Sequence, residues 1–241
     1  MHSCTVMHCA SIRALENRGR KIRHRLAIVG LLAAWIALGL FGHDPWKPDE
    51  AYTFGVVYEA LKKGDWLVPT LAGQPFVEKP PLFFWTAAVL AKAFAPVLPL
   101  PDAARLASGF YVGLALFFTW LTAGRRIAAP LLLAGCLGFL QHAHQLVTDD
   151  ALIAGVAIGL YGLRASRGFV LGTGAGIAFL SKGLLGPGVL GLTALLLPAF
   201  PAWRASWRQW GWAAGAFAPW ALIWPWLFYR HSPVLFDDGS G

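Results

Sequence analysis

Long apolar runs separated by short polar intervals dominate the sequence. They lie at about residues 26–42, 81–96, 104–123, 128–147, 150–164, 168–182, 183–200 and 210–229. A helix needs about 20 apolar residues to cross the hydrocarbon core of a bilayer, and several of these runs are shorter than that. The pattern predicts an all-α protein, a polytopic membrane helical bundle. The short runs do not fix the exact ends of its spans.

One polar interval is much longer than the others and runs from His43 to Trp85. It holds six of the twelve carboxylates, namely Asp44, Asp49, Glu50, Glu59, Asp65 and Glu78. Charged groups are costly in lipid, so a cluster of acids between apolar runs indicates a loop outside the bilayer. In a membrane protein, such a cluster indicates where chemistry takes place.

The composition agrees with a membrane location. Only 13% of the residues are charged and 57% are hydrophobic, and the chain has 12 Trp, a residue that favours the membrane–water interface. The net charge of +8 falls in short basic clusters between apolar runs, which is typical of topology signals and not of a nucleic-acid-binding surface. The three cysteines form no CxxC pair, so structural zinc and a disulfide framework are not expected.

The basic clusters indicate how the chain crosses the bilayer, because Lys and Arg in short loops favour the cytoplasmic side. We take the run 81–96 to lie at the outer interface without crossing. The basic tail and three later clusters then share the cytoplasmic side: Arg125–Arg126, Arg164–Arg167 and Arg204–Arg208. If the run 81–96 crossed instead, those three clusters would fall outside. This arrangement predicts about seven transmembrane helices.

The expected organisation is a multi-pass protein of the cell inner membrane. Residues 1–25 would form a cytoplasmic tail, and residues 26–241 a transmembrane domain that includes an external loop over residues 43–103. The loop would share its side of the membrane with three further polar features, Thr148–Asp150, Ser181–Lys182 and Asp237–Asp238. Polar features that meet on one face indicate a functional site.

A surface helix is predicted inside the loop. Asp49 and Glu50 suit its first turn, and Gly64, directly after two lysines, suits its end. Its apolar side would comprise Tyr52, Val56, Tyr58, Ala60 and Leu61, with Trp66 as an interfacial anchor. Asp49 has two interpretations, a helix cap or a functional carboxylate.

The motif Glu78–Lys79–Pro80–Pro81 is a second local signal. Pro80 favours an extended Lys79, and Pro81 suits the first turn of a helix that begins there. Lys79 would thus stand at a helix amino terminus, where unpaired N–H groups already favour an anion. It would hold a phosphate there, or alternatively reach along the membrane interface.

Two further cations have a functional and a structural interpretation. Lys182 lies between two apolar runs, so it must face water, a partner or a substrate phosphate. Arg105, just outside the second span, pairs either with a loop acid or with a phosphate.

Histidine and glycine motifs in the spans favour structural roles. His142 and His144, two residues apart on a helix, face different directions, which favours a polar role at the membrane edge over a shared metal ion. Gly172, Gly174 and Gly176 lie in an apolar run, where such spacing indicates helix packing and not nucleotide binding.

These motifs resemble a known family. The sequence is similar to the amino-terminal half of bacterial lipid-linked-sugar glycosyltransferases of the protein mannosyltransferase and aminoarabinose transferase type, which have the GT-C membrane fold. The resemblance covers about residues 26–230 and rests on Asp49–Glu50, Glu59, the segment 64–85 with Glu78–Lys79–Pro80–Pro81, Ala104–Arg105–Leu106, Thr148–Asp149–Asp150–Ala151–Leu152 and the segment 179–187.

The resemblance implies that a sugar passes from a polyprenyl-phosphate donor to a lipid, glycan or protein acceptor on the outer face of the membrane. Asp49 would be the general base, and Lys79 would contact the donor phosphate. Asp149 or Asp150 would be the acid that opens the second outer loop. Tyr52 stands where the family often has an arginine.

The chemistry agrees with these roles. A carboxylate within hydrogen-bond reach can take the proton of an attacking hydroxyl, and a preplaced cation stabilises a leaving phosphate. Direct displacement would invert the anomeric centre. Arg105 and Lys182 are further phosphate candidates, and Glu50, Glu59 and Glu78 are supporting acids. Glu78 and the pair Asp149–Asp150 are also candidate ligands for a divalent cation such as Mg²⁺ or Mn²⁺, with Glu78 and Asp150 foremost.

Enzymes of this type continue through several more spans, whereas this chain stops just after its seventh. We therefore expect a missing carboxy-terminal half or a partner subunit. The alternative function is a truncated or non-catalytic membrane subunit that binds lipid-linked sugar or assists assembly. A transporter is disfavoured, because transporters place their polar residues near the bilayer midplane.

Overall fold

The computed structural model describes residues 19, 23, 26–197 and 207–233. Most of the basic tail, the cluster at residues 204–206 and Asp237–Asp238 therefore lie outside the described residues. The described elements are the helix Leu26–Leu38, α2 (Lys47–Lys63), β1 (Thr70–Leu71), β2 (Gln74–Pro75), α3 (Leu82–Phe94), α4 (Leu100–Thr122), α5 (Ala128–Ala134), α6 (Leu137–His142), α7 (Asp149–Arg164), α8 (Gly168–Lys182), α9 (Leu185–Leu196) and α10 (Trp207–His231).

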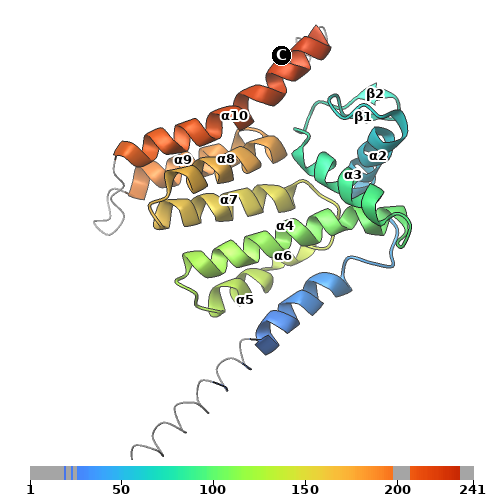
Figure 1. The fold of residues 1–241 in the computed structure, drawn as a ribbon. Coiled ribbons are helices and arrows are strands. Elements are labelled where there is room, and N and C mark those ends of the chain that lie inside the picture. Colours follow the sequence, from blue (N-terminus) through green and yellow to red (C-terminus); the bar gives the residue numbers. More distant parts are fainter. Residues whose placement is uncertain (1–18, 20–22, 24–25, 198–206, 234–241) are drawn as a thin grey trace, which may run out of the picture.

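The architecture is a helical bundle with a small unit at one end, named the polar unit for the charged residues of α2 and of the segment before α3. Helices α4, α7, α8 and α10 pack in sequence, and α2, α3 and the β1–β2 hairpin gather at one end of them (Figure 1). Among the described residues, α4 is the single helix both long and apolar enough to cross a membrane. The helix Leu26–Leu38, α3, α8 and α9 are shorter apolar helices.

One predicted span is broken. The run 128–147 forms two short helices, α5 and α6, separated by Gly135 and an extended Cys136. Gly135 is a poor helix former, and Pro130 and Gly138 weaken the same segment further. The prediction of one continuous helix there was wrong, because hydropathy alone does not report helix breaks.

Helix α2 has the predicted end but not the predicted apolar side. It ends at Lys63, and Gly64 follows in the left-handed conformation with φ 76°. Val56, Val57 and Ala60 are buried, whereas two of the predicted positions, Tyr52 and Tyr58, are exposed. The buried stripe lies on the face that α3 and the hairpin cover, which the sequence of the helix alone does not specify.

Helix α3 begins within one residue of its predicted start and belongs to the core. Phe83, Phe84 and Ala87 are buried in one cluster with side chains of α4 and α7. Trp66 packs against this cluster, and its carbonyl oxygen accepts a hydrogen bond from the indole of Trp85. Trp66 therefore contributes to the protein core and is not simply an exposed interfacial anchor.

The glycines of α8 pack helices closely, as predicted. A Cβ on Gly172 or Gly176 would collide with α10, and a Cβ on Gly174 would collide with the backbone of α7. Small residues let helix backbones approach when apolar burial drives little association within lipid. Three helices are thereby held at short range, and the nucleotide-binding alternative has no open glycine loop.

The basic clusters lie together at the end of the bundle opposite α2. A Cβ on Gly124 would lie 3.6 Å from the guanidinium of Arg164, so the α4–α5 turn adjoins the α7–α8 turn. Gly168 packs against Gln209, which places Arg208 nearby. Figure 1 shows the polar unit at the other end. The fold thus separates basic turns from the acidic loop.

Candidate functional site

The carboxylate of Asp49 does not cap a helix. The N-cap of α2 is Trp46, and its N–H donates to Glu50 Oε2 at 2.7 Å. Asp49 makes no side-chain cap bond, so the capping interpretation was wrong and its neighbour satisfies the helix end instead. The side chain of Asp49 is 76% exposed, and its Oδ1 lies 3.7 Å from Lys79 Nζ.

Lys79 precedes α3 by three residues and is largely enclosed, with 21% of its side chain exposed. Lys79 lies in a bend before Pro80, and its ammonium group reaches the first turn of α2. The site therefore begins as an accessible carboxylate next to a half-buried cation. The other predicted role, a lysine that reaches along the interface, does not account for this pairing.

A second acid–cation pair joins α7 and α8. Lys182 Nζ lies 2.5 Å from Asp149 Oδ1, and both side chains are about one third exposed at 36% and 30%. Asp149 opens α7 and Lys182 closes α8, so the antiparallel packing of these two helices brings the charges together. This pair accounts for a lysine between two apolar runs.

Asp149 and Asp150 have different environments. Asp150 is 1% exposed, and neither of its carboxylate oxygens has a hydrogen-bond partner in the described part of the chain. Thr148 is also buried, and its hydroxyl has no hydrogen-bond partner among the residues that the structure describes. Asp149 is therefore the member of the pair that a substrate can reach, and Asp150 faces the α4–α7 interior.

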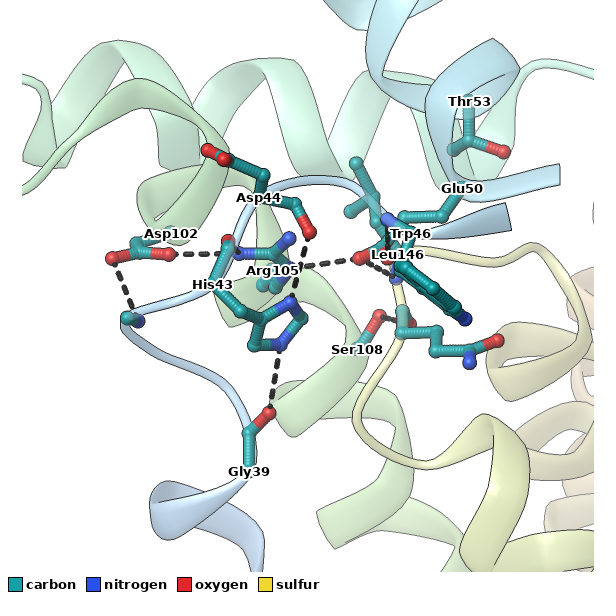
Figure 2. Close-up of polar contacts among 12 residues, drawn as sticks. Gly39, His43, Asp44, Trp46, Glu50, Thr53, Asp102, Arg105, Ser108 and Leu146 are labelled. Carbon is teal, nitrogen blue, oxygen red and sulfur yellow. Dashed lines mark hydrogen bonds and ion pairs between the residues drawn. The ribbon is translucent and has the colours of Figure 1, made fainter. Parts of the chain in front are cut away.

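Arg105 is fully buried and held by acids (Figure 2). Its Nε donates to Glu50 Oε1 at 2.7 Å, and its Nη1 donates to Asp102 Oδ1 at 2.8 Å. Of the two roles expected for Arg105, the structure favours the pairing with a loop acid over the contact with a donor phosphate. Asp102 was missed in the sequence, although its place three residues before Arg105 on a helix was an available signal.

Glu59 supports the hairpin. Its carboxylate accepts hydrogen bonds from Thr70 Oγ1 at 2.7 Å and from the Gly73 N–H at 2.9 Å, and it pairs with Lys63 at 2.7 Å. The bond from Lys63, followed by that from Thr70, lowers the pKa of Glu59 to about 2. The hairpin is followed by Glu78 and Lys79, so Glu59 fixes the segment from which Lys79 extends.

The candidate metal ligands do not come together. The described residues contain no group of three or more His, Cys, Asp or Glu side chains that could share an ion. Asp150 is buried, whereas Glu78 is exposed in the segment after the hairpin. His144 instead bonds the Trp35 carbonyl at 2.9 Å and contacts its ring. The described residues therefore offer no cluster of protein ligands for a resident cation.

The fold is that of a polytopic membrane bundle of the GT-C class. The chain superposes on ArnT from Cupriavidus metallidurans in the apo state with a TM-score of 0.75 and 21% identity, over 89% of this chain and 43% of that one. The match to the same protein bound to undecaprenyl phosphate has a TM-score of 0.72 and 22% identity, over 87% and 42%.

Sequence comparison agrees with the fold. No family model matches the chain. An undecaprenyl phosphate-alpha-4-amino-4-deoxy-L-arabinose arabinosyl transferase of Sodalis glossinidius is 32% identical over 194 residues, 71% of this chain and 33% of that protein. Its counterpart in Pseudomonas savastanoi pv. phaseolicola is 29% identical over 192 residues, 72% and 34%.

The chain is therefore a relative of the lipid-linked-sugar glycosyltransferases of the aminoarabinose transferase type, and the resemblance in the motifs is confirmed. It spans about a third of the length of the curated relatives that it matches.

Proposed function

We propose that this chain carries the donor-binding residues and the general base of a membrane glycosyltransferase that uses a polyprenyl-phosphate-linked sugar. The observation that carries the proposal is the contact between Asp49 and Lys79, an accessible carboxylate 3.7 Å from an enclosed ammonium group. A transfer of this kind requires a base beside the acceptor and a cation beside the leaving phosphate, on either side of one bound sugar.

The reaction is a displacement at the anomeric carbon. The acceptor hydroxyl attacks that carbon and gives its proton to Asp49 as the new C–O bond forms. The bond from the same carbon to the phosphate oxygen breaks, and polyprenyl phosphate leaves with the electron pair. Lys79 stabilises the charge that grows on the phosphate, and attack opposite the leaving group inverts the sugar.

The names of the relatives support the donor class. The curated relatives are arabinosyl transferases that use undecaprenyl phosphate-alpha-4-amino-4-deoxy-L-arabinose, and one structure with the same fold is bound to undecaprenyl phosphate. Lys182 is a second cation for the same donor, because its ammonium group is partly exposed beside Asp149. The acceptor is a lipid, glycan or protein.

The arrangement of charges supports an outward-facing site in the inner membrane. Basic turns lie at one end of the bundle, and the polar unit with Asp49 lies at the other. Because basic loops favour the cytoplasm, we place α2, the hairpin and the site outside and the amino terminus inside. Labelling of a cysteine at position 125 only from the cytoplasmic side tests this orientation.

A second candidate function needs only the partly exposed cations Lys79 and Lys182. A non-catalytic membrane subunit would bind lipid-linked sugar through these lysines without transferring it.

The test uses the purified chain in detergent with radiolabelled polyprenyl-phosphate sugars. Asp49→Asn should lower sugar release or transfer by at least about 100-fold while donor binding persists. Asp44→Asn is the matched control, because it changes an exposed acid of the same loop. Donor binding without turnover in the wild type would select the non-catalytic function. Equal turnover in wild type and Asp49→Asn would overturn the proposed base.

A further inference from the structure

Arg105 connects three segments that are distant in the sequence. Besides its bonds to Glu50 and Asp102, its Nη1 donates to the carbonyl of His43 at 2.8 Å. Asp102 in turn accepts the N–H of Gly42 at 3.2 Å through its other oxygen. Figure 2 shows the guanidinium between the two carboxylates, beneath the loop that leads into α2. One arginine therefore fixes this loop and α2 to the start of α4.

Glu50 extends the connection to α7. Its Oε1 accepts the N–H of Leu146 at 3.0 Å in addition to the bond from Arg105, while its Oε2 accepts the N–H of Trp46. Leu146 lies three residues before Asp149. A single carboxylate thus joins the start of α2 to the segment that leads into α7 (Figure 2).

The position of this cluster relative to the site is informative. Asp49 is the chain neighbour of Glu50, and the hydroxyl of Thr53 donates to the Asp49 carbonyl at 2.8 Å, which stiffens the same turn. Glu50, Arg105 and Thr53 are all buried. Glu50 therefore lies next to Asp49 in the chain, and its bonding partner Leu146 lies three residues before Asp149. Asp49 and Asp149 are the two accessible acids of the site.

Stability alone does not require such a cluster. Removing charges from water is costly, and buried ion pairs are often no better for stability than apolar side chains of similar size. Here two carboxylates share one guanidinium, so Asp102 alone would balance the charge of Arg105. The additional acid, Glu50, is the one that contacts α2 and the segment before α7.

We propose that Glu50 and Arg105 are positioning residues that set the Asp49 carboxylate relative to the Asp149–Lys182 pair, without contacting substrate. This inference rests on the proposed function. A displacement of about 1 Å can cost about 100-fold in rate when reacting groups must be aligned. The cluster holds α2 against α4 and α7 by hydrogen bonds of defined direction, which is the kind of restraint such alignment needs.

Glu50→Gln is the variant that tests the inference. It leaves one carboxylate and one guanidinium in the cluster, so it creates no unbalanced buried charge, and it cannot accept from both Arg105 and Trp46. We expect a kcat lower by about 10- to 100-fold with the donor KM unchanged. Amide exchange should rise in residues 43–50 and 145–150 but not in α10. Asp44→Asn, in the same loop, should change neither property.

A second variant guards against a general loss of fold. Arg105→Lys keeps the charge but not the planar fork that serves Glu50, Asp102 and the His43 carbonyl together, so it should reproduce the kcat loss. Wild-type kcat in Glu50→Gln, with Asp49→Asn inactive, would overturn the positioning role and leave the proposed function intact. Unchanged amide exchange in Glu50→Gln would be enough to show that Glu50 does not hold α2 against α4 and the segment before α7. A wild type without turnover would remove the proposed function and the positioning role together.

Discussion

Lys79 Nζ lies 3.7 Å from Asp49 Oδ1, and this contact joins the segment before α3 to the first turn of α2. The two groups differ in accessibility, since the carboxylate is 76% exposed and the lysine side chain 21%. A partly exposed ion pair contributes little to stability, so we expect changes at these two residues to affect chemistry more than folding.

Lys79→Met should weaken binding of polyprenyl phosphate by about 10- to 100-fold, because a hydrogen bond to a charged group contributes about 1.5–3 kcal/mol. Asp49→Asn should not weaken this binding, because it removes a negative charge beside the phosphate. The measurement is titration of undecaprenyl phosphate into the protein in nanodiscs. Lys92→Met, at an exposed lysine of α3, is the control. Similar affinity in Lys79→Met and Lys92→Met would remove Lys79 from the donor site.

The pair Asp149–Lys182 can be tested by exchanging its members. In the double variant Asp149→Lys and Lys182→Asp, the partly exposed ion pair is restored in reverse, and the unfolding free energy should stay within about 1 kcal/mol of the wild type. Transfer should be lost, because the exchange removes the cation from the position at which we propose that Lys182 contacts the donor phosphate. The thermal midpoint and turnover are measured together. Retained turnover would mean that the pair only connects α7 to α8.

The contribution of Glu59 to stability should depend on pH in a defined direction. Its pKa is lowered from 4.5 to about 2 by its bonds to Lys63 and Thr70, so the deprotonated form favours the folded state. The stabilisation is fully present above about pH 4.5 and is lost as the pH falls toward 2. The difference in thermal midpoint between wild type and Glu59→Gln should therefore be constant from neutral pH to about pH 5 and shrink below that. A difference that grows on acidification would contradict this assignment.

The packing of α7 on α8 should tolerate no side chain at Gly174. Gly174→Ala places a methyl group against the backbone of Gly155 and Gly159, and overpacking of this kind costs about 1–3 kcal/mol. Gly191→Ala in α9, where a Cβ meets nothing within 4 Å, is the matched control and should be neutral or slightly stabilising. Thermal unfolding in detergent measures both variants. Equal midpoints would mean that the two backbones are not in close contact.

Much of the fold could be predicted from local signals. The end of α2 at Gly64 and the start of α3 after Pro80–Pro81 follow from the conformational preferences of glycine and proline, which act within a few residues. The break at Gly135 has local signals in Gly135 and Gly138, but the hydropathy of the run did not reveal it. The exposure of Tyr52 depends on which neighbours cover α2, and apolar content does not specify those neighbours.

The sequence by itself determined the class of the protein and predicted the loop in which we propose its site, because hydropathy, basic clusters and the Glu78–Lys79–Pro80–Pro81 motif are properties of neighbouring residues. Only the tertiary structure decided what each charged group contacts. Asp49 pairs with Lys79, whereas Glu50 bonds the N–H of the helix N-cap. Asp149 is partly exposed and Asp150 is buried, and Arg105 binds two acids. The deciding contacts join residues 33, 55 and 96 positions apart, and chain packing alone brings such residues together.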